Sequence, residues 1–326
     1  MVLGKLDFKA SLHGILVIQD ERLPARRLPW RDEPLPRYFL PYRGLVGLAM
    51  ICIFWPADVL GFDPLGQYSF FPLWLGYILV VDSLVLRRTG SSLLVRNPLA
   101  VVGMFLLAIP YWWSFEWINQ VTQNWTYIGD DEYSRVNGLM IGSLHFSVVI
   151  PAVFESAELI GSFSWIRRFG GGPRIKLSHP QLYGVIFTGF LSLAALLLWP
   201  SYFYPLTWLF LFFIFDPINY LRGQPSVVAQ LRYGDWRPFV AIMFGALLTG
   251  WFWEMWNSAS VSWVYDIGFF DFAHIFEMPL LGYGGYLPFG LETFAVYHFV
   301  VGVLPWPSSG NLPVAGRRQR AAITPS

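Results

Sequence analysis

The sequence predicts an all-α polytopic membrane protein whose eight transmembrane helices form two parallel four-helix repeats. Three observations support this fold class: an apolar composition, an uneven placement of Lys and Arg, and an internal duplication. Of the 326 residues, 55% are hydrophobic and only 13% are charged. Soluble domains carry roughly 25% charged residues. Much of this protein's surface is therefore expected to face lipid.

Eight apolar stretches have about the length that crosses a bilayer as a helix. They cover residues 44–61, 70–86, 98–115, 137–162, 182–199, 202–221, 238–256 and 274–305. Three polar segments separate or flank them: an N-terminal tail (1–43), a linker rich in glycine (163–181) and a C-terminal tail (306–326). This pattern divides the membrane region into repeat 1 (44–162) and repeat 2 (182–305).

Basic residues cluster at alternate ends of the predicted spans. Of the 22 Lys and Arg residues, eight lie in the N-terminal tail, three after the second span, four after the fourth, three after the sixth, and three in the C-terminal tail. Cytoplasmic segments of membrane proteins carry such an excess. We therefore expect a multi-pass protein of the cell inner (plasma) membrane with both termini in the cytoplasm. The net charge of +1 gives no reason to expect a nucleic-acid partner.

One constellation of polar and aromatic residues occurs twice in the chain. In both copies, Glu precedes Asn by three residues and Trp by nine, Trp precedes Tyr by two, and a later Pro precedes Glu by four. The members are Asp82, Glu116, Asn119, Trp125, Tyr127 and Glu155 in the first copy, and Asp216, Glu254, Asn257, Trp263, Tyr265 and Glu292 in the second. Because four spans per copy is an even number, both copies enter from the same side, which predicts a repeat axis along the membrane normal.

Carboxyl groups inside spans are costly and usually face a bundle interior or a wet cavity. Burial disfavours their charged form, so such a group can keep a proton and donate it to a substrate. Glu155 and Glu292 are the best candidates for catalytic acids on this argument, with Glu116 and Glu254 as further candidates.

The remaining repeated residues are candidates for substrate binding. Asn119 and Asn257 share a helix face with the glutamate three residues before them. The Trp and Tyr residues at 125, 127, 263 and 265 would add aromatic walls, although they also fit an interfacial aromatic belt. Asp82 and Asp216 lie nearer the cytoplasmic ends and equally fit structural bonds between helices.

Repeat 2 contains one passage without a counterpart in repeat 1. Residues 274–288 include two prolines and several glycines, so a regular helix is not expected there. The passage is either an outer loop or a broken segment that dips into the membrane, with Glu277 and Glu292 beside it. If the two halves have diverged, this passage favours repeat 2 as the active half.

The sequence carries no signature of a cofactor or metal site. Cys52 is the only cysteine, the histidines form no close pairs, and no phosphate loop, dinucleotide fingerprint or HExxH zinc motif occurs. The expected chemistry therefore needs no cofactor and no metal. Protonated carboxyl groups beside aromatic faces, which stabilise carbocations, suit acid-initiated isoprenoid chemistry.

The duplicated spans resemble the integral-membrane lycopene cyclase domain of carotenoid biosynthesis. The residues that carry this resemblance are Asp82 and Asp216, the two W-x-Y elements at 125–127 and 263–265, and the Pro-to-Glu elements at 151–155 and 288–292. The resemblance implies an enzyme that acts on a lipid-soluble isoprenoid or carotenoid by cyclisation, hydration or isomerisation.

Two other classes of protein fit the same residues. A proton-coupled transporter would use the carboxylates to bind protons or cations at the interface between the repeats. A non-catalytic subunit of a membrane complex would pack its aromatic residues against pigments, quinone or partner helices. The partners expected in all three cases are the lipid bilayer and either a hydrophobic small molecule or other membrane proteins.

Overall fold

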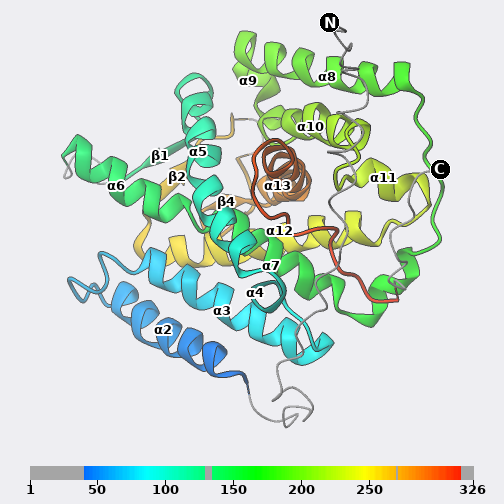
Figure 1. Ribbon diagram of the computed structural model, residues 1–326. Helices are drawn as coiled ribbons and strands as arrows, with labels where there is room; N and C mark the ends of the chain where they lie inside the picture. Colours follow the sequence, from blue (N-terminus) through cyan, green and yellow to red (C-terminus); the bar gives the residue numbers. More distant parts are fainter. Residues whose placement is uncertain (1–39, 129–133, 269–270, 317–326) are drawn as a thin grey trace, which may run out of the picture. The chain divides into compact units, whose positions relative to one another are not determined.

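The computed structural model describes residues 40–128, 134–268 and 271–316. Among these residues, eight helical spans are long and apolar enough to cross a membrane. Repeat 1 contributes α2 (Tyr42–Val59), α3 (Phe70–Thr89), α5 (Pro98–Thr122) and the pair α6 (Arg135–Phe146) and α7 (Val149–Gly161). Repeat 2 contributes α8 (His179–Leu198), the group α9 (Pro200–Phe203), η3 (Tyr204–Trp208) and α10 (Phe210–Leu221), then α12 (Arg237–Ser260) and α13 (Tyr283–Val303). The predicted fold class and number of spans are confirmed (Figure 1).

Local sequence signals explain where several of these helices begin and end. The Asn97 side chain accepts a hydrogen bond from the Ala100 N–H at the start of α5, where Pro98 occupies a position that needs no N–H donor. Ser178 and Gln181 form a capping box at the start of α8. Gly90 ends α3 in the left-handed conformation, with φ of 74°.

A pair of short strands relates the two repeats by two-fold symmetry. The strands β1 (Trp125–Tyr127) and β2 (Trp263–Tyr265) pair antiparallel, with Trp125 opposite Tyr265 and Tyr127 opposite Trp263. Equivalent residues therefore exchange places across a point between Thr126 and Val264. A two-fold axis parallel to the spans produces this register, as the parallel repeats predict. We call the end of the bundle that carries β1 and β2 the aromatic end, and the opposite end the arginine end.

Packing between the repeats follows the same symmetry. Trp74 of α3 lies against Trp253 of α12, with ring centroids 5.3 Å apart. The equivalent Trp208 of repeat 2 stacks on Phe115 of α5 at 5.4 Å. The second span of each repeat thus contacts the third span of the other, so the repeats share one core rather than forming two separate bundles.

Two equivalent helix contacts differ because the residues in them differ in size. Where α12 meets α7, a Cβ atom on Gly245 would lie 2.5 Å from the backbone nitrogen of Ala157, so the backbones touch. Gly245 stands nine residues before Glu254, and the equivalent residue of α5, nine before Glu116, is Leu107. Ala157 stands two residues after Glu155, and the equivalent residue of α13, two after Glu292, is Phe294. In keeping with these larger side chains, α5 and α13 make a much smaller contact than α7 and α12.

The irregular passage of repeat 2 is shorter than the sequence predicted. Residues 274–282 form a small hairpin of β3 (His274–Ile275) and β4 (Met278–Pro279), followed by the 3-10 turn η5 (Leu280–Gly282). The expectation of irregular backbone up to residue 288 is wrong, because α13 already begins at Tyr283 and includes Pro288. Pro288 stands only five residues after the first residue of the helix, where few intrahelical hydrogen bonds are lost.

Residues after α13 return along the bundle at the arginine end. Leu312 and Val314 are buried there, and the Ala315 N–H donates to the Gly161 carbonyl at 2.8 Å. The Trp306 indole N–H donates to the Leu99 carbonyl of α5 at 3.0 Å. The first part of the predicted C-terminal tail is therefore packed onto the helices. The predicted N-terminal tail lies outside the described residues except for its last four.

Candidate functional site: an aromatic chamber at the interface of the repeats

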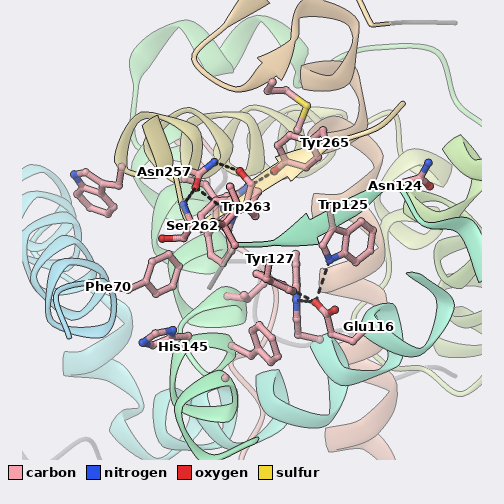
Figure 2. Close-up of a pocket in the computed structure, with 18 of the residues that line it drawn as sticks. Phe70, Glu116, Asn124, Trp125, Tyr127, His145, Asn257, Ser262, Trp263 and Tyr265 are labelled. Carbon is pink, nitrogen blue, oxygen red and sulfur yellow. Dashed lines mark hydrogen bonds between the residues drawn. The ribbon is translucent and has the colours of Figure 1, made fainter. Parts of the chain in front are cut away.

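A large cavity opens at the aromatic end, and both repeats contribute to its wall. Its volume is about 1110 Å³, above the roughly 300–1,000 Å³ usual for small-molecule pockets. The α2–α3 connection, α3, α5, α6, β1, β2, η3, α12 and the start of α13 all supply lining residues. We call this cavity the aromatic chamber. Figure 2 shows part of its wall, with Glu116, Tyr127, Trp263 and His145 among the labelled side chains.

Glu116 is the repeated carboxyl group that lines the chamber. Its Oε1 atom accepts hydrogen bonds from the Trp112 indole at 2.7 Å, the Trp125 indole at 3.3 Å and the Tyr127 hydroxyl at 2.6 Å. The side chain is half-buried. Three donors directed at one oxygen stabilise negative charge on this group. The repeated spacing of Glu, Trp and Tyr therefore encodes a carboxylate held by the W-x-Y strand (Figure 2).

Glu254 forms the equivalent centre in repeat 2, but it is buried behind the wall. Its Oε1 atom accepts hydrogen bonds from the hydroxyls of Tyr265, at 2.7 Å, and Tyr286, at 2.5 Å. The Trp263 indole donates to the Tyr265 oxygen at 2.8 Å instead of reaching the carboxylate. Both tyrosines line the chamber, whereas Glu254 itself does not.

The two centres differ because one donor has moved to another helix. Four residues before the glutamate, repeat 1 has Trp112 and repeat 2 has Gly250. A Cβ atom on Gly250 would lie 2.5 Å from the ring of Tyr286, so the tyrosine occupies the space left by the missing side chain. At the position equivalent to Tyr286, two residues before the repeated proline, repeat 1 has Val149. The donor from Trp112 is thus replaced by one from α13.

Asn119 and Asn257 bind backbone groups in the same way in the two repeats. The Asn119 amide donates to the Trp125 carbonyl at 2.8 Å, and its oxygen accepts from the N–H groups of Asn124 and Trp125. The Asn257 amide makes the equivalent bonds with Trp263 and Ser262. Each asparagine ties the end of a long helix to the strand after it, and so positions the Trp and Tyr side chains.

The strand tyrosines stand outside the spans and keep their protons. Burial raises the pKa of Tyr127 well above its ordinary value, and the nearby charge of Glu116 raises it further. Burial and Glu254 raise the pKa of Tyr265 in the same way. Each tyrosine therefore remains a hydrogen-bond donor to its carboxylate across the physiological pH range.

Asp82 and Asp216 lie at the arginine end, away from the chamber lining. Asp216 accepts from the N–H groups of Val227 and Val228 at 2.7 and 2.9 Å, at the start of α11 (Val227–Arg232). Asp82 accepts from the Leu94 N–H at 3.0 Å, in α4 (Leu93–Arg96), and also pairs with Arg43 at 2.5 Å. Each aspartate therefore holds the short helix that follows its own span.

Glu155 and Glu292, the best acid candidates by sequence, are buried in α7 and α13 and do not line the chamber. The Glu155 carboxyl group lies beside those of Asp82 and Glu158, and the Glu292 carboxyl group lies beside the backbone of Leu211. Glu158, one turn from Glu155, pairs with Arg96. Glu277 lies in the turn between β3 and β4, and it also does not line the chamber. The structure therefore brings Glu116 and the four strand aromatics together, and places the other candidate carboxyl groups elsewhere.

Several chamber residues carry no signal in the sequence. Trp112, Trp208, Trp253, Tyr286 and His145 all line the cavity. None of them belongs to the repeated constellation, although Trp208 has a counterpart in Trp74, since each precedes the repeated aspartate by eight residues. Their common property is an aromatic ring, and aromatic residues are abundant throughout the chain.

Comparison of the chain with protein-family models, curated proteins and solved structures found no match.

Proposed function

We propose that this multi-pass membrane protein is an enzyme that acts on a lipid-soluble isoprenoid or carotenoid inside the aromatic chamber. The observation that carries this proposal is the half-buried Glu116 carboxyl group on the wall of a large cavity rich in aromatic side chains. In the orientation that the basic residues predict, both termini are cytoplasmic and the chamber lies in the outer half of the plasma membrane.

The chamber suits a long apolar molecule. Trp, Phe and Tyr make up 14 of its 44 described lining residues, and ring centroids of neighbouring Trp residues lie 5.5–6.5 Å apart. Such walls bind apolar chains through dispersion and burial of apolar surface. They also place π-faces around the ligand, which stabilise a carbocation through the ring quadrupole.

Glu116 is the proposed proton donor in this chamber, acting from the fraction of molecules in which its carboxyl group is protonated. Its carboxyl group would protonate one carbon of a substrate double bond, leaving a carbocation on the other carbon. The carboxylate formed in this step is stabilised by the donors Trp112, Trp125 and Tyr127. Attack by a second double bond, followed by loss of a proton to the carboxylate, would complete a cyclisation; direct loss from a neighbouring carbon would complete an isomerisation. Both reactions balance without an oxidant or reductant.

The test is the lipid and pigment profile of cells that express the protein, together with mass spectrometry of molecules that co-purify with it. We expect an isoprenoid to co-purify. Glu116→Gln, which keeps the shape of the side chain, should still bind this molecule but stop its conversion. Asp271→Asn, which changes an exposed carboxylate outside the chamber, serves as the control. A folded Glu116→Gln protein with an unchanged profile would disprove the proposed role of this residue, and a bound molecule without an isoprenoid skeleton would disprove the substrate class.

A proton-coupled carrier is the second candidate, because hydroxyl groups continue from the chamber into the core. Thr249 lines the chamber, and its hydroxyl lies 3.0 Å from that of Ser156, which lies 2.7 Å from the Tyr77 hydroxyl. Ser156 adjoins the buried Glu155 in α7. A carrier would show substrate-dependent proton flux in reconstituted vesicles, and this flux should fall in Ser156→Ala. Absence of flux with the co-purified molecule on both sides would exclude this candidate.

A further inference from the structure

The charged side chains of the chamber wall are all acidic. Asp58, Asp63 and Glu116 line the cavity, and its described lining contains neither Lys nor Arg. His145 is the one histidine there, and its ring packs against Phe70 with centroids 4.9 Å apart. Pockets that bind phosphate or carboxylate groups usually present Arg, Lys or backbone N–H groups. The charge of this wall instead favours a positive ligand.

Seven tryptophans are among the described lining residues, and four of them donate the indole N–H to protein acceptors. Those of Trp112 and Trp125 bind Glu116, that of Trp263 binds the Tyr265 oxygen, and that of Trp113 binds Ser143 at 3.0 Å. The Trp256 indole N–H, by contrast, has no hydrogen-bond partner among the described residues. The N–H groups of the other four tryptophans already bind protein acceptors and are not free for an anion. What they present to a ligand is the negative π-face of the ring, which attracts cations.

We propose that the aromatic chamber selects ligands with a positively charged or cation-forming end on an apolar chain, and rejects ligands with a phosphate or diphosphate group. This inference rests on the proposed function for the identity of the apolar chain, since it narrows the isoprenoid substrates to those without a phosphate group. The preference for a positive head group follows from the lining residues alone and does not depend on the proposed function.

The test compares three ligands that share an octyl chain and differ in the head group: octyltrimethylammonium, octanol and octyl phosphate. Binding is measured by isothermal titration calorimetry with the full chain in nanodiscs of zwitterionic lipid, and titrations into empty nanodiscs are subtracted. We expect octyltrimethylammonium to bind at least about tenfold more tightly than octyl phosphate, from the strength of partly desolvated cation–π contacts. Equal affinities, or tighter binding of octyl phosphate, would overturn the proposal.

Two variants show whether the acidic wall causes this preference. Glu116→Gln and Asp63→Asn should each weaken binding of octyltrimethylammonium by roughly threefold to tenfold and leave octanol binding within about twofold. Asp63 is exposed on the connection between α2 and α3, so its variant is expected to fold even if Glu116→Gln does not. Asp271→Asn should leave the affinities for all three ligands unchanged. A cation affinity that survives in both wall variants would contradict the proposal.

The outcome is separable from that of the proposed enzyme. If Glu116→Gln leaves the lipid profile unchanged but octyltrimethylammonium still binds preferentially, the enzymatic proposal fails and the charge selectivity stands. If an isoprenoid is converted but octyl phosphate binds as tightly as the cation, the selectivity fails and the enzymatic proposal stands.

Discussion

Glu116 in repeat 1 and Glu254 in repeat 2 occupy equivalent positions but have different access to the chamber. Both accept a hydrogen bond from the tyrosine of their W-x-Y strand, at 2.6 and 2.7 Å. Glu116 then takes two indole donors and stays half-buried, whereas Glu254 takes Tyr286 and is fully buried. The comparison teaches that both repeats kept the glutamate and the strand tyrosine that donates to it. The exchange of Trp112 for Gly250, with Tyr286 in the space that the glycine leaves, buries Glu254, whereas Glu116 still lines the chamber.

The helix-to-strand connection is the part that the two repeats share most closely, and changes there should have the largest effect. Asn257→Ala removes three hydrogen bonds from a nearly fully buried site and should lower the free energy of unfolding by about 3 kcal/mol. Asn119→Ala should cost less, about 2 kcal/mol, because its site is half-buried and water can replace part of what is lost.

Unfolding in mixed detergent micelles measures both values. Asn124→Ala is the matched control, because the Asn124 side chain donates a hydrogen bond at an exposed site, to the Asp266 carbonyl at 3.1 Å. Equal, small effects in all three variants would contradict the proposed role of the repeated asparagines in holding the strands.

Gly250 is the position where the two centres diverge, and filling it should break the repeat 2 centre. The Cβ atom of Gly250→Ala would meet the Tyr286 ring at 2.5 Å and displace its hydroxyl from Glu254. Overpacking of this kind costs about 1–3 kcal/mol, so we expect a loss of about 2 kcal/mol in the free energy of unfolding.

Gly184→Ala in α8 is the control for this change. Apart from the adjoining backbone of α8 itself, no atom lies within 4 Å of the Cβ position there, so alanine should stabilise the helix by up to about 1 kcal/mol. The two substitutions are therefore expected to have opposite signs in the same unfolding measurement. A stabilising Gly250→Ala would show that Tyr286 is not fixed against this glycine.

The smallest expected effect is the loss of folding stability at alkaline pH that Tyr127 and Tyr265 cause. In the unfolded chain, tyrosine loses its proton near pH 10, whereas the pKa values of Tyr127 and Tyr265 are raised well above this in the folded protein. Their contribution to stability is therefore complete below about pH 10 and falls as the pH rises further, because only the unfolded state gains from ionisation.

Thermal unfolding at pH 9 and pH 11 tests this expectation. Tyr127→Phe and Tyr265→Phe should each lose less stability than the wild type between these two values, and by similar amounts if the repeats are equivalent in this respect. Thr126→Val, in the same strand, adds no ionisable group and should follow the wild type. Identical losses of stability in all proteins would mean that folding does not raise the pKa of either tyrosine.

The sequence by itself determined the spans and the repeat. Apolar length and basic residues are local properties, so most ends of the eight spans lie within three residues of the predicted ones. The exceptions are the third span, which ends at Thr122 rather than 115, and the eighth, which begins at Leu280 rather than 274. The duplicated spacing likewise predicted a common axis along the spans, which the pairing of β1 with β2 confirms. It also marked Glu116, Trp125 and Tyr127 as one group, because a helix end and the strand after it are close in the chain.

Only the tertiary structure decided which of the repeated residues face the chamber. Glu155 and Glu292 looked like the best acids because their spans are apolar, but the side of a span that meets a cavity depends on how the other helices pack around it. The replacement of Trp112 by Tyr286 joins α13 to α12 across 32 residues of sequence, and no spacing rule within one helix predicts it. The sequence favoured repeat 2 as the active half on account of its irregular passage. The structure instead opens the carboxylate of repeat 1, because Gly250 leaves room for a tyrosine that covers Glu254.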